Sequence, residues 1–255
     1  MSGSLHILLA EDNAINQRLA VYLLEKRGHE VVVANNGKEV LTTLAHQPFD
    51  LVLMDVQMPE MDGLETTARI RTREQERGGH VPIIAMTAHA MEGDRERCLK
   101  AGMDGYLTKP VRPRELFETI ARLIPHRADI GAEESLETST NDVFDRTSLL
   151  ARIEGDKTLL QELIGLFLED APQRLDHLRD ALVDNDAQQL ERIAHTLKGA
   201  AGNVCAHRTF EAAKRLERLA KMGDVLKTTD AFTDLEMEMT RLQAVLNAFI
   251  ETHVP

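Results

Sequence analysis

The stretch DLVLMDVQMPEMDG, residues 50–63, decides the fold of the first half of the chain. It opens with a short continuous apolar run, which predicts a buried strand over 50–54 that leads into Asp55. Gly63 then punctuates the chain, and a stretch with helical periodicity follows at about 63–74. A buried strand that passes through a loop into an amphipathic helix is the repeating unit of α/β proteins with a parallel sheet.

The same alternation extends to both sides of this stretch. Further continuous apolar runs predict four more buried strands, at residues 6–10, 30–34, 81–86 and 105–107. The amphipathic stretches around them predict four more helices, at about 14–27, 37–46, 89–101 and 113–124. Five strands alternating with five helices predict an α/β fold with a doubly wound, five-stranded parallel sheet, whose ligands bind at the carboxyl ends of the strands.

The second half of the chain has a different pattern. From Asp145 onward no strand pattern occurs, and apolar side chains recur at helical spacing. The periodic segments lie at about 149–168, 186–204, 207–222 and 229–251. Because only short breaks separate them, we expect antiparallel neighbours packed as an all-α helix bundle.

A polar segment at 125–143 separates the two halves. It lacks sustained periodicity and is rich in Ser, Thr and Glu, and residues 126–144 carry five acidic side chains against one basic. This composition is typical of a solvated, flexible connector. The sequence therefore predicts an α/β domain at 1–124, a flexible acidic linker at 125–143 and a helical domain at 144–255.

The bulk composition excludes several classes of protein. The formal net charge of −12 argues against nucleic acid as a partner, because phosphate contacts need clustered Lys and Arg. Cys98 and Cys205 lie far apart without a metal-ligand motif, which disfavours structural zinc and suits a reducing cytoplasm. No apolar run approaches the roughly 20 residues of a membrane helix, so we expect no membrane contact by this segment. No secretion signal is visible, and we expect a piece of a longer protein.

Polar side chains gather at the carboxyl ends of the predicted strands. They are Glu11 and Asp12 after the first strand, Asp55 at the end of the third, Thr87 after the fourth and Lys109 after the fifth. In a doubly wound sheet these ends converge on one crevice. Three carboxylates together need a cation, and hard oxygen ligands favour Mg²⁺, which also binds phosphate oxygens. A single Asp at a strand end is usually a helix cap, but this convergence favours a site that stabilises a transferring phosphoryl group.

Residues 5–124 closely resemble a response-regulator receiver domain over their whole length. The matching pieces are LLAEDNAINQ, DLVLMDVQMPEMDG, IIAMTAHA and AGMDGYLTKPV. The resemblance implies a flavodoxin-like fold in which Asp55 accepts a phosphoryl group from a phosphohistidine. The Mg²⁺ ligands that it implies are Glu11, Asp12, Asp55 and the backbone carbonyl of Gln57.

The resemblance also implies roles for the neighbours of this site. Thr87 and Lys109 would contact the phosphoryl group, and the bond between Lys109 and Pro110 would be cis, a form that only X–Pro bonds adopt cheaply. Thr87 and Tyr106 would form a coupled switch pair. The alternative for Tyr106 is a half-buried aromatic residue without such a role.

A phosphatase with a nucleophilic aspartate is a competing interpretation of Asp55. Such enzymes carry an acid/base aspartate two residues later. Here that position is Gln57, which cannot serve as a general acid. The sequence therefore disfavours the phosphatase.

The segment LERIAHTLKGAAGNV, residues 190–204, is the most informative helix of the second half. Its apolar stripe lies roughly opposite His195, which predicts that His195 points to solvent. Gly199 and Gly202 share the predicted exposed face and would let a partner approach the imidazole, while Lys198 could pair with phosphoryl oxygens. An exposed histidine is ordinarily a plain surface residue, and a metal role is disfavoured because no second ligand lies one turn away.

Residues at about 145–251 resemble a histidine-containing phosphotransfer (HPt) domain. AHTLKGAAGN matches the His-x-x-Lys-Gly core of that family, and the other helices match in pattern more than in residue identity. The resemblance implies that His195 accepts a phosphoryl group, supported by Lys198 and Gly199.

The two resemblances together predict a phosphorelay module of a two-component system, as at the C-terminal end of hybrid sensor histidine kinases. An upstream histidine kinase would donate the phosphoryl group, and a downstream response-regulator receiver domain would accept it. No ATP-binding kinase domain is recognisable, and the location would be cytoplasmic, including the cytoplasmic part of a membrane-anchored sensor kinase. Two alternatives stay open: a scaffold without chemistry, which the complete site disfavours, and a stand-alone phosphotransfer or docking protein.

Overall fold

The computed structural model describes residues 3–87, 92–124, 143–223 and 225–253. The chain forms two compact units, Met1–Glu134 and Ser135–Pro255. The first is built from strands and helices, and the second from helices. All but one residue of the predicted linker at 125–143 lie outside the described residues, so the linker stays a prediction.

Five parallel strands form the sheet of the first unit, in the order β2-β1-β3-β4-β5. They are β1 His6–Ala10, β2 Glu30–Ala34, β3 Leu51–Asp55, β4 Ile83–Thr87 and β5 Gly105–Thr108. The strand order reverses at β1 and β3, which confirms the doubly wound topology. The crevice for ligands in such a sheet lies where the order reverses, at the carboxyl ends of these two strands.

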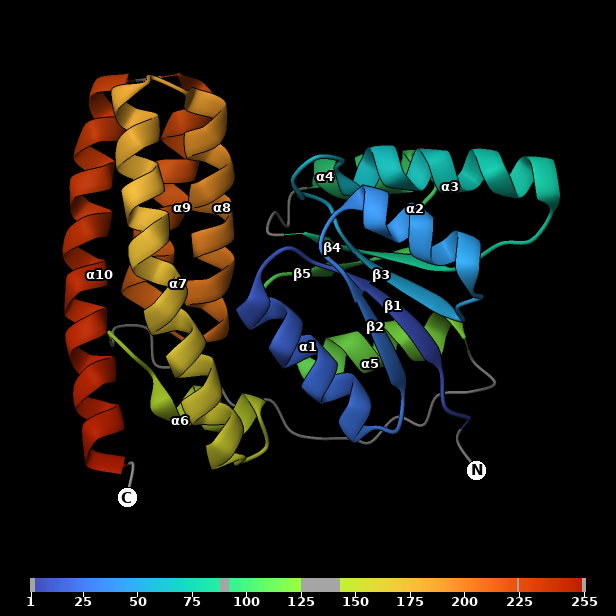
Figure 1. Ribbon diagram of the computed structural model, residues 1–255, viewed down its shortest axis with the longest axis horizontal. Coiled ribbons are helices and arrows are strands. Elements are labelled where there is room, and N and C mark those ends of the chain that lie inside the picture. Colours follow the sequence, from blue (N-terminus) through green and yellow to red (C-terminus); the bar gives the residue numbers. More distant parts are fainter. Residues whose placement is uncertain (1–2, 88–91, 125–142, 224, 254–255) are drawn as a thin grey trace. The chain divides into compact units, whose positions relative to one another are not determined.

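Helices cover both faces of this sheet (Figure 1). One face carries α1 (Ala14–Lys26) and α5 (Pro113–Leu123), and the other carries α2 (Gly37–His46), α3 (Gly63–Arg77) and α4 (Glu92–Lys100). The helices α1, α2 and α3 each begin after a side chain that accepts hydrogen bonds from N–H groups of the first turn. These side chains are Asn13, Asn36 and Asp62. The start of the helix predicted at 89–101 lies outside the described residues, and α4 is described from Glu92.

The two edge strands are less buried than the sequence predicts. All residues of β3 and β4 are buried, as expected for the centre of a parallel sheet. By contrast, β2 buries only Ala34 and leaves Val33 36% exposed, and β5 alternates between buried and half-buried residues. The prediction of a buried strand is therefore wrong for β2 and only partly right for β5. An edge strand has a neighbour on one side only, and a short apolar run does not reveal its place in the sheet.

The start of α3 lies directly against the end of β3. A Cβ atom added to Gly63 would lie 2.2 Å from the carbonyl oxygen of Asp55, so only glycine permits this approach. The N–H of Gly63 donates to the carbonyl oxygen of Val56 at 2.9 Å. Asp62 caps α3 by accepting a hydrogen bond from the Glu65 N–H at 2.7 Å. The loop that leads from Asp55 into α3 is therefore fixed at its far end.

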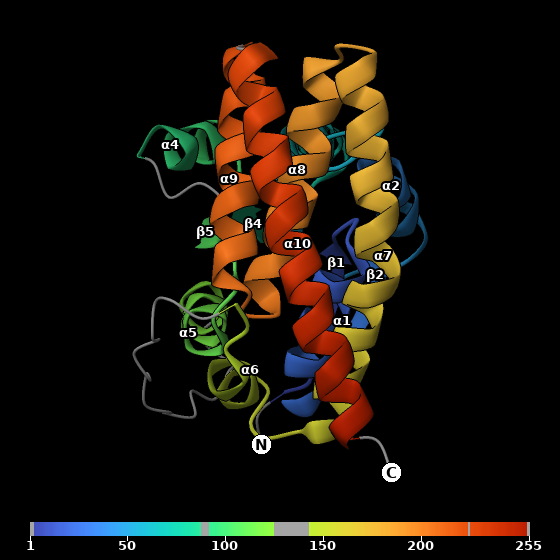
Figure 2. The same ribbon diagram turned by 90° about the vertical axis from the view of Figure 1, so that its left-hand side faces the viewer.

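The second unit is all-α, as predicted. Its helices are α6 Arg146–Arg152, α7 Lys157–Val183, α8 Ala187–Asn203, α9 His207–Met222 and α10 Val225–His253. The four longer helices run alongside one another as a bundle (Figures 1 and 2). Its core includes Leu163, Phe167, Leu178, Leu197, Leu216, Leu235 and Leu242. The helix α7 is longer than its apolar pattern indicated, because it continues through Pro172 although proline removes a backbone hydrogen bond.

Neither cysteine forms a disulfide. Cys98 is 2% exposed and Cys205 is half-buried. Burial raises the pKa of the Cys205 thiol above its ordinary value of 9.0. Both thiols are therefore poor nucleophiles at neutral pH, Cys98 because it is buried and Cys205 because partial burial also raises its pKa.

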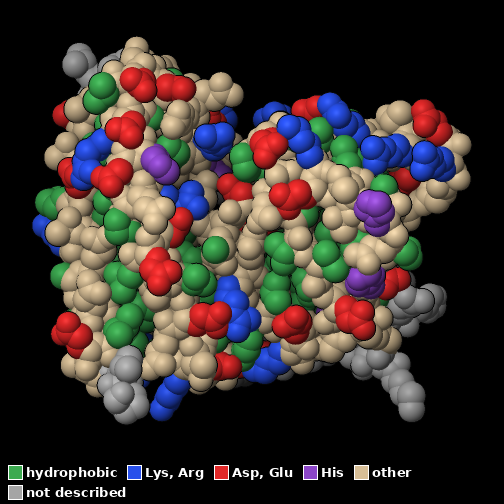
Figure 3. Space-filling view, viewed as in Figure 1, with side chains coloured by type: hydrophobic (Ala, Val, Ile, Leu, Met, Phe, Trp, Pro, Cys, Tyr) green, Lys and Arg blue, Asp and Glu red, His purple; other side chains and the backbone are tan. Residues whose placement is uncertain are grey.

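The described surface carries charges of both signs. Acidic and basic side chains are interspersed on the face drawn in Figure 3. Several form pairs, such as Arg69 with Glu65 at 2.6 Å and Lys38 with Glu60 at 3.0 Å. Among the described helices, none combines the length and the apolar character that crossing a membrane requires.

Candidate functional sites

The carboxyl ends of β1 and β3 bring three carboxylates together. Ala10 is the register partner of Met54, so Glu11 follows directly beside Asp55. Ligand oxygens of Glu11, Asp12 and Asp55 all lie within 4.8 Å of one another. Glu11 and Asp55 are each 1% exposed. The predicted convergence of these side chains is confirmed, and the three together can hold a metal ion.

The ammonium of Lys109 lies between two of these carboxylates. Its Nζ is 2.5 Å from Glu11 Oε2 and 2.6 Å from Asp55 Oδ2. The backbone N–H of Lys109 donates to the carbonyl oxygen of Thr87 at 2.7 Å, which ties the end of β5 to the end of β4. The bond between Lys109 and Pro110 is cis, as the receiver resemblance implies.

Burial and neighbouring charges set the protonation of this cluster. Burial raises the pKa of Asp55, Lys109 offsets part of the shift, and the Glu11 and Asp12 charges add to it, giving about 7. For Lys109, burial lowers the pKa, but the Asp55 and Glu11 carboxylates outweigh it and raise the pKa above its ordinary value of 10.5. Lys109 therefore remains an ammonium at neutral pH. A further cation beside the carboxylates would favour the ionised form of Asp55.

Two more predicted residues lie at the same edge of the sheet. Thr87 is the last residue of β4 and is 6% exposed. The N–H of Gln57 donates to Asp55 Oδ1 at 3.2 Å, and its side-chain Oε1 is buried without a partner among the described residues.

Tyr106 is half-buried, with the Arg95 guanidinium 5.7 Å from the centre of its ring. The coupled role of Thr87 and Tyr106 stays a prediction.

His195 lies on α8 but does not point to open solvent, contrary to the prediction. It is 5% exposed, and Lys198 is 2% exposed. The helix packs against α7 and also against α9, so that every residue from 193 to 201 is buried, Gly199 included. The apolar stripe is indeed buried, but it is only one of two buried faces. Gly202, two turns from His195, is half-buried.

Glu217 on α9 joins His195 and Lys198, although it was not among the residues predicted from the sequence. Its Oε1 lies 2.6 Å from His195 Nδ1, and its Oε2 accepts a hydrogen bond from Lys198 Nζ. Glu217 is itself 2% exposed. An ionised carboxylate can only accept, so the neutral imidazole carries its proton on Nδ1 and its lone pair on Nε2. The arrangement therefore selects Nε2 as the nucleophilic nitrogen.

We expect the helical unit to lose stability in acid as Glu217 becomes protonated. Burial alone would raise the pKa of Glu217, but the hydrogen bond from His195 and the charge of Lys198 outweigh it and lower the pKa from 4.5 to about 2. A depressed carboxylate pKa gives stability that is present above the unfolded value of 4.5 and is lost as the pH falls through about 2. The shift corresponds to roughly 3 kcal/mol.

Denaturant titrations followed by circular dichroism on the intact chain, from about pH 5 to about pH 2, check this expectation. Glu217→Gln should flatten the pH dependence of the helical transition. The control Glu211→Gln changes an exposed carboxylate on the same helix, paired with Lys214 at 3.0 Å, and should keep the wild-type dependence. Equal slopes for all three proteins would contradict the assignment.

Two family models match the chain. Residues 7–121 match the response regulator receiver domain, and residues 162–245 match the Hpt domain. The first match runs from β1 into α5 and contains the whole carboxylate cluster with Lys109. The second begins within α7, ends within α10 and contains His195, Lys198 and Glu217.

Relatives are similar to the chain across both units. The sensor histidine kinase GacS of Pseudomonas protegens is 34% identical over 247 residues, 93% of this chain and 26% of that protein. The signal transduction histidine-protein kinase BarA of Escherichia coli is 28% identical over 242 residues, 92% of this chain and 25% of that protein. The chain thus spans about a quarter of the length of these relatives.

Solved structures are similar to the first unit, and one example carries a metal ion. It is the receiver domain of the sensor histidine kinase PA1611 from Pseudomonas aeruginosa, with a magnesium ion coordinated in its active-site cleft. The two sequences are 41% identical, and the match covers 48% of this chain and 99% of that one, with a TM-score of 0.44.

Proposed function

We propose that this chain carries phosphoryl groups on Asp55 and His195. Its residues 7–121 belong to the response regulator receiver family, and its residues 162–245 belong to the Hpt family. It is a receiver and Hpt pair of the kind found in histidine-kinase phosphorelays. The observation that carries the proposal for the receiver is the buried cluster of three carboxylates with a lysine ammonium between them.

At the receiver, a carboxylate oxygen of Asp55 attacks the phosphorus of a phosphohistidine. The P–N bond breaks, and the released imidazole takes up a proton. Lys109 Nζ, 2.6 Å from Asp55 Oδ2, pairs with the negative charge of the transferring group. The Thr87 hydroxyl contacts a phosphoryl oxygen as a hydrogen-bond partner.

Mg²⁺ is the proposed cofactor of this site. The donors fit, because Glu11, Asp12 and Asp55 offer hard carboxylate oxygens in one place. The backbone carbonyl of Gln57 is the proposed fourth ligand. When bound, Mg²⁺ supplies positive charge that offsets the charge of the phosphoryl oxygens.

At the Hpt domain, His195 Nε2 is the proposed phosphoryl acceptor. Glu217 holds the Nδ1 proton and fixes the plane of the imidazole ring. Lys198, which lies one turn after His195 and donates to the other oxygen of Glu217, is the proposed partner of a phosphoryl oxygen. Gly199, one turn after His195, is proposed to support the acceptor because it adds no side chain beside the imidazole.

The whole protein to which the chain belongs is proposed to be a hybrid sensor histidine kinase. The upstream partner is then a phosphohistidine of its kinase part, and the downstream partner is the receiver domain of a response regulator. The proposed parts of the chain are a receiver domain at 1–124, a flexible linker at 125–143 and an HPt domain at 144–255. The stand-alone alternative lacks support from the relatives, which are kinases about four times as long.

Labelled phosphate tests the proposal on the intact chain. Acetyl phosphate with Mg²⁺ should give an acyl phosphate on the receiver, with release of acetate, and a chelator should prevent it. A phosphorylated histidine kinase as donor should in addition give an acid-labile phosphate on the Hpt domain. Absence of label under both conditions would contradict the proposal and favour a scaffold.

A further inference from the structure

Two adjacent amide side chains in α1, Asn16 and Gln17, both donate hydrogen bonds to Glu11. Asn16 is 7% exposed, and Gln17 is half-buried. Neither belongs to the carboxylate cluster or carries charge. Between them they hold the carboxylate and the main chain of a single acidic residue.

Asn16 orients the carboxylate of Glu11. Its Nδ2 donates to Glu11 Oε1 at 2.8 Å, while Lys109 Nζ lies 2.5 Å from Oε2. The backbone N–H of Asn13 adds a longer hydrogen bond to Oε1 at 3.3 Å. Each carboxylate oxygen of Glu11 therefore has its own donor, and together these bonds fix the orientation of the carboxylate group.

Gln17 holds the main chain of the same residue. Its Nε2 donates to the carbonyl oxygen of Glu11 at 2.6 Å and to Asn35 Oδ1 at 2.9 Å. This one amide therefore joins the loop after β1 to the loop after β2. The bond fixes the position from which both Glu11 and Asp12 project.

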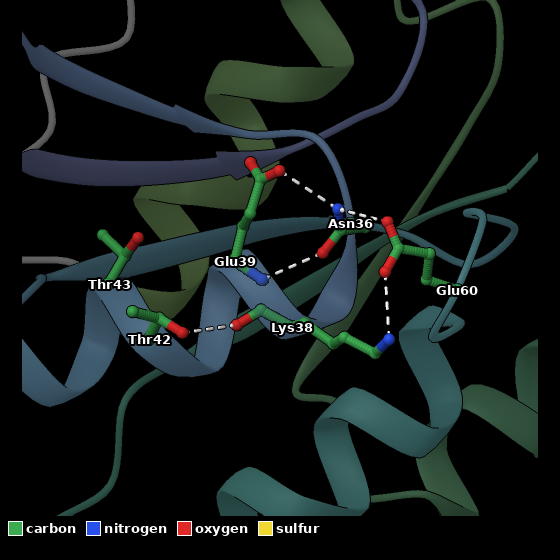
Figure 4. Close-up of a pocket in the computed structure, with 6 residues that line it drawn as sticks. All are labelled: Asn36, Lys38, Glu39, Thr42, Thr43 and Glu60. Atoms are coloured by element: carbon green, nitrogen blue, oxygen red, sulfur yellow. Dashed lines mark hydrogen bonds and ion pairs between the residues drawn. The ribbon is translucent and has the colours of Figure 1, made fainter.

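The loop after β2 is itself braced. The backbone N–H and Nδ2 of Asn35 donate to Glu39 Oε2 at 2.8 and 2.9 Å. Asn36, the next residue of this loop, also contacts Glu39 (Figure 4). Its Nδ2 donates to Glu39 at 3.1 Å and to Glu60 at 3.3 Å. Glu60 lies in the loop after β3, which also carries Gln57. Hydrogen bonds thus connect the three loops at this edge of the sheet.

We propose that Asn16 and Gln17 are positioning residues for the metal site, holding Glu11 and Asp12 in the geometry that Mg²⁺ requires. The inference rests on the proposed function of that site. Mg²⁺ demands near-ideal octahedral geometry, so it does not tolerate ligands that are displaced or free to rotate. Outer partners that orient the ligands of a metal typically change its affinity by about 10- to 100-fold when removed.

The test compares Mg²⁺ affinity by titration calorimetry on intact chains. Gln17→Leu replaces the amide with an apolar group and so removes its donor, and Asn16→Ala removes the donor to Glu11. We expect each to weaken Mg²⁺ binding by about tenfold. The matched control is Gln75→Leu, the same substitution at an exposed residue of α3, and its affinity should equal that of the wild type.

Two further measurements separate positioning from a general structural role. The thermal midpoint without Mg²⁺ should change little for Gln17→Leu, whose side chain is only half-buried. The rate of labelling by acetyl phosphate should recover at saturating Mg²⁺, so that the half-saturating concentration rises and the maximal rate does not fall.

Unchanged Mg²⁺ affinity in both variants would overturn the inference while leaving the proposed function intact. Loss of affinity in proportion to a lowered thermal midpoint would also overturn it. If Asn16→Ala does not fold, Gln17→Leu alone decides the outcome. Absence of Mg²⁺ binding by the wild-type chain would overturn both the inference and the proposed cofactor.

Discussion

Asp55→Asn is expected to abolish acyl phosphate formation on the intact chain. The carboxamide has no anionic oxygen to attack phosphorus, and it leaves Lys109 with Glu11 as its remaining close carboxylate. With labelled acetyl phosphate and Mg²⁺, label on the receiver should fall to the level seen with a chelator. Removal of a nucleophile typically lowers the rate of transfer by several orders of magnitude.

Asp62→Asn is the matched control for this substitution. Asp62 is an exposed carboxylate in the same loop, and asparagine keeps the oxygen that caps α3. This variant should be labelled as the wild type is. Persistent acyl phosphate in Asp55→Asn, or its loss in Asp62→Asn, would show that another carboxylate is the acceptor.

His195→Gln is expected to abolish the acid-labile phosphate on the Hpt domain. Glutamine has no nucleophilic ring nitrogen, but its amide can donate to Glu217 as Nδ1–H does, so the bundle should fold. With a phosphorylated histidine kinase as donor, the receiver should still be labelled on Asp55. The label should then stop there and not reach a downstream receiver domain.

His207→Gln makes the same change at an exposed histidine that begins α9. It should support transfer to a downstream receiver as the wild type does. Acid-labile phosphate that survives His195→Gln would refute the assignment, and its position could be mapped among the remaining histidines. The two pairs of variants thus test the two acceptors independently.

The carboxylate site could be predicted because strand ends occupy a known place in a parallel sheet. Once Asp55 ends one strand and Glu11 follows another, the register of β1 and β3 leaves them side by side. The exposure of β2 could not be predicted in the same way. Val33 is as apolar as its neighbours in the strand, and only the order of the strands places it at an edge.

The surroundings of His195 were predicted less well. A single helix shows which of its faces is apolar, but not how many neighbours will cover it. Glu217 did leave a signal, since it lies one turn from Ala213 and Ala220 on a buried stripe, where an unpaired charge would be costly. Its partners on α8 lie about twenty positions earlier, and no local pattern relates the two helices.

The burial of Cys98 and the partial burial of Cys205 make this chain suitable for distance spectroscopy. A cysteine placed at an exposed site, for example by Gln75→Cys on the receiver or Met222→Cys on the Hpt domain, should react with a maleimide dye much faster than Cys98 or Cys205. A donor and an acceptor dye at such positions would report energy transfer between the two units. The separation of receiver and Hpt domain could then be followed through a turnover without first replacing Cys98 or Cys205.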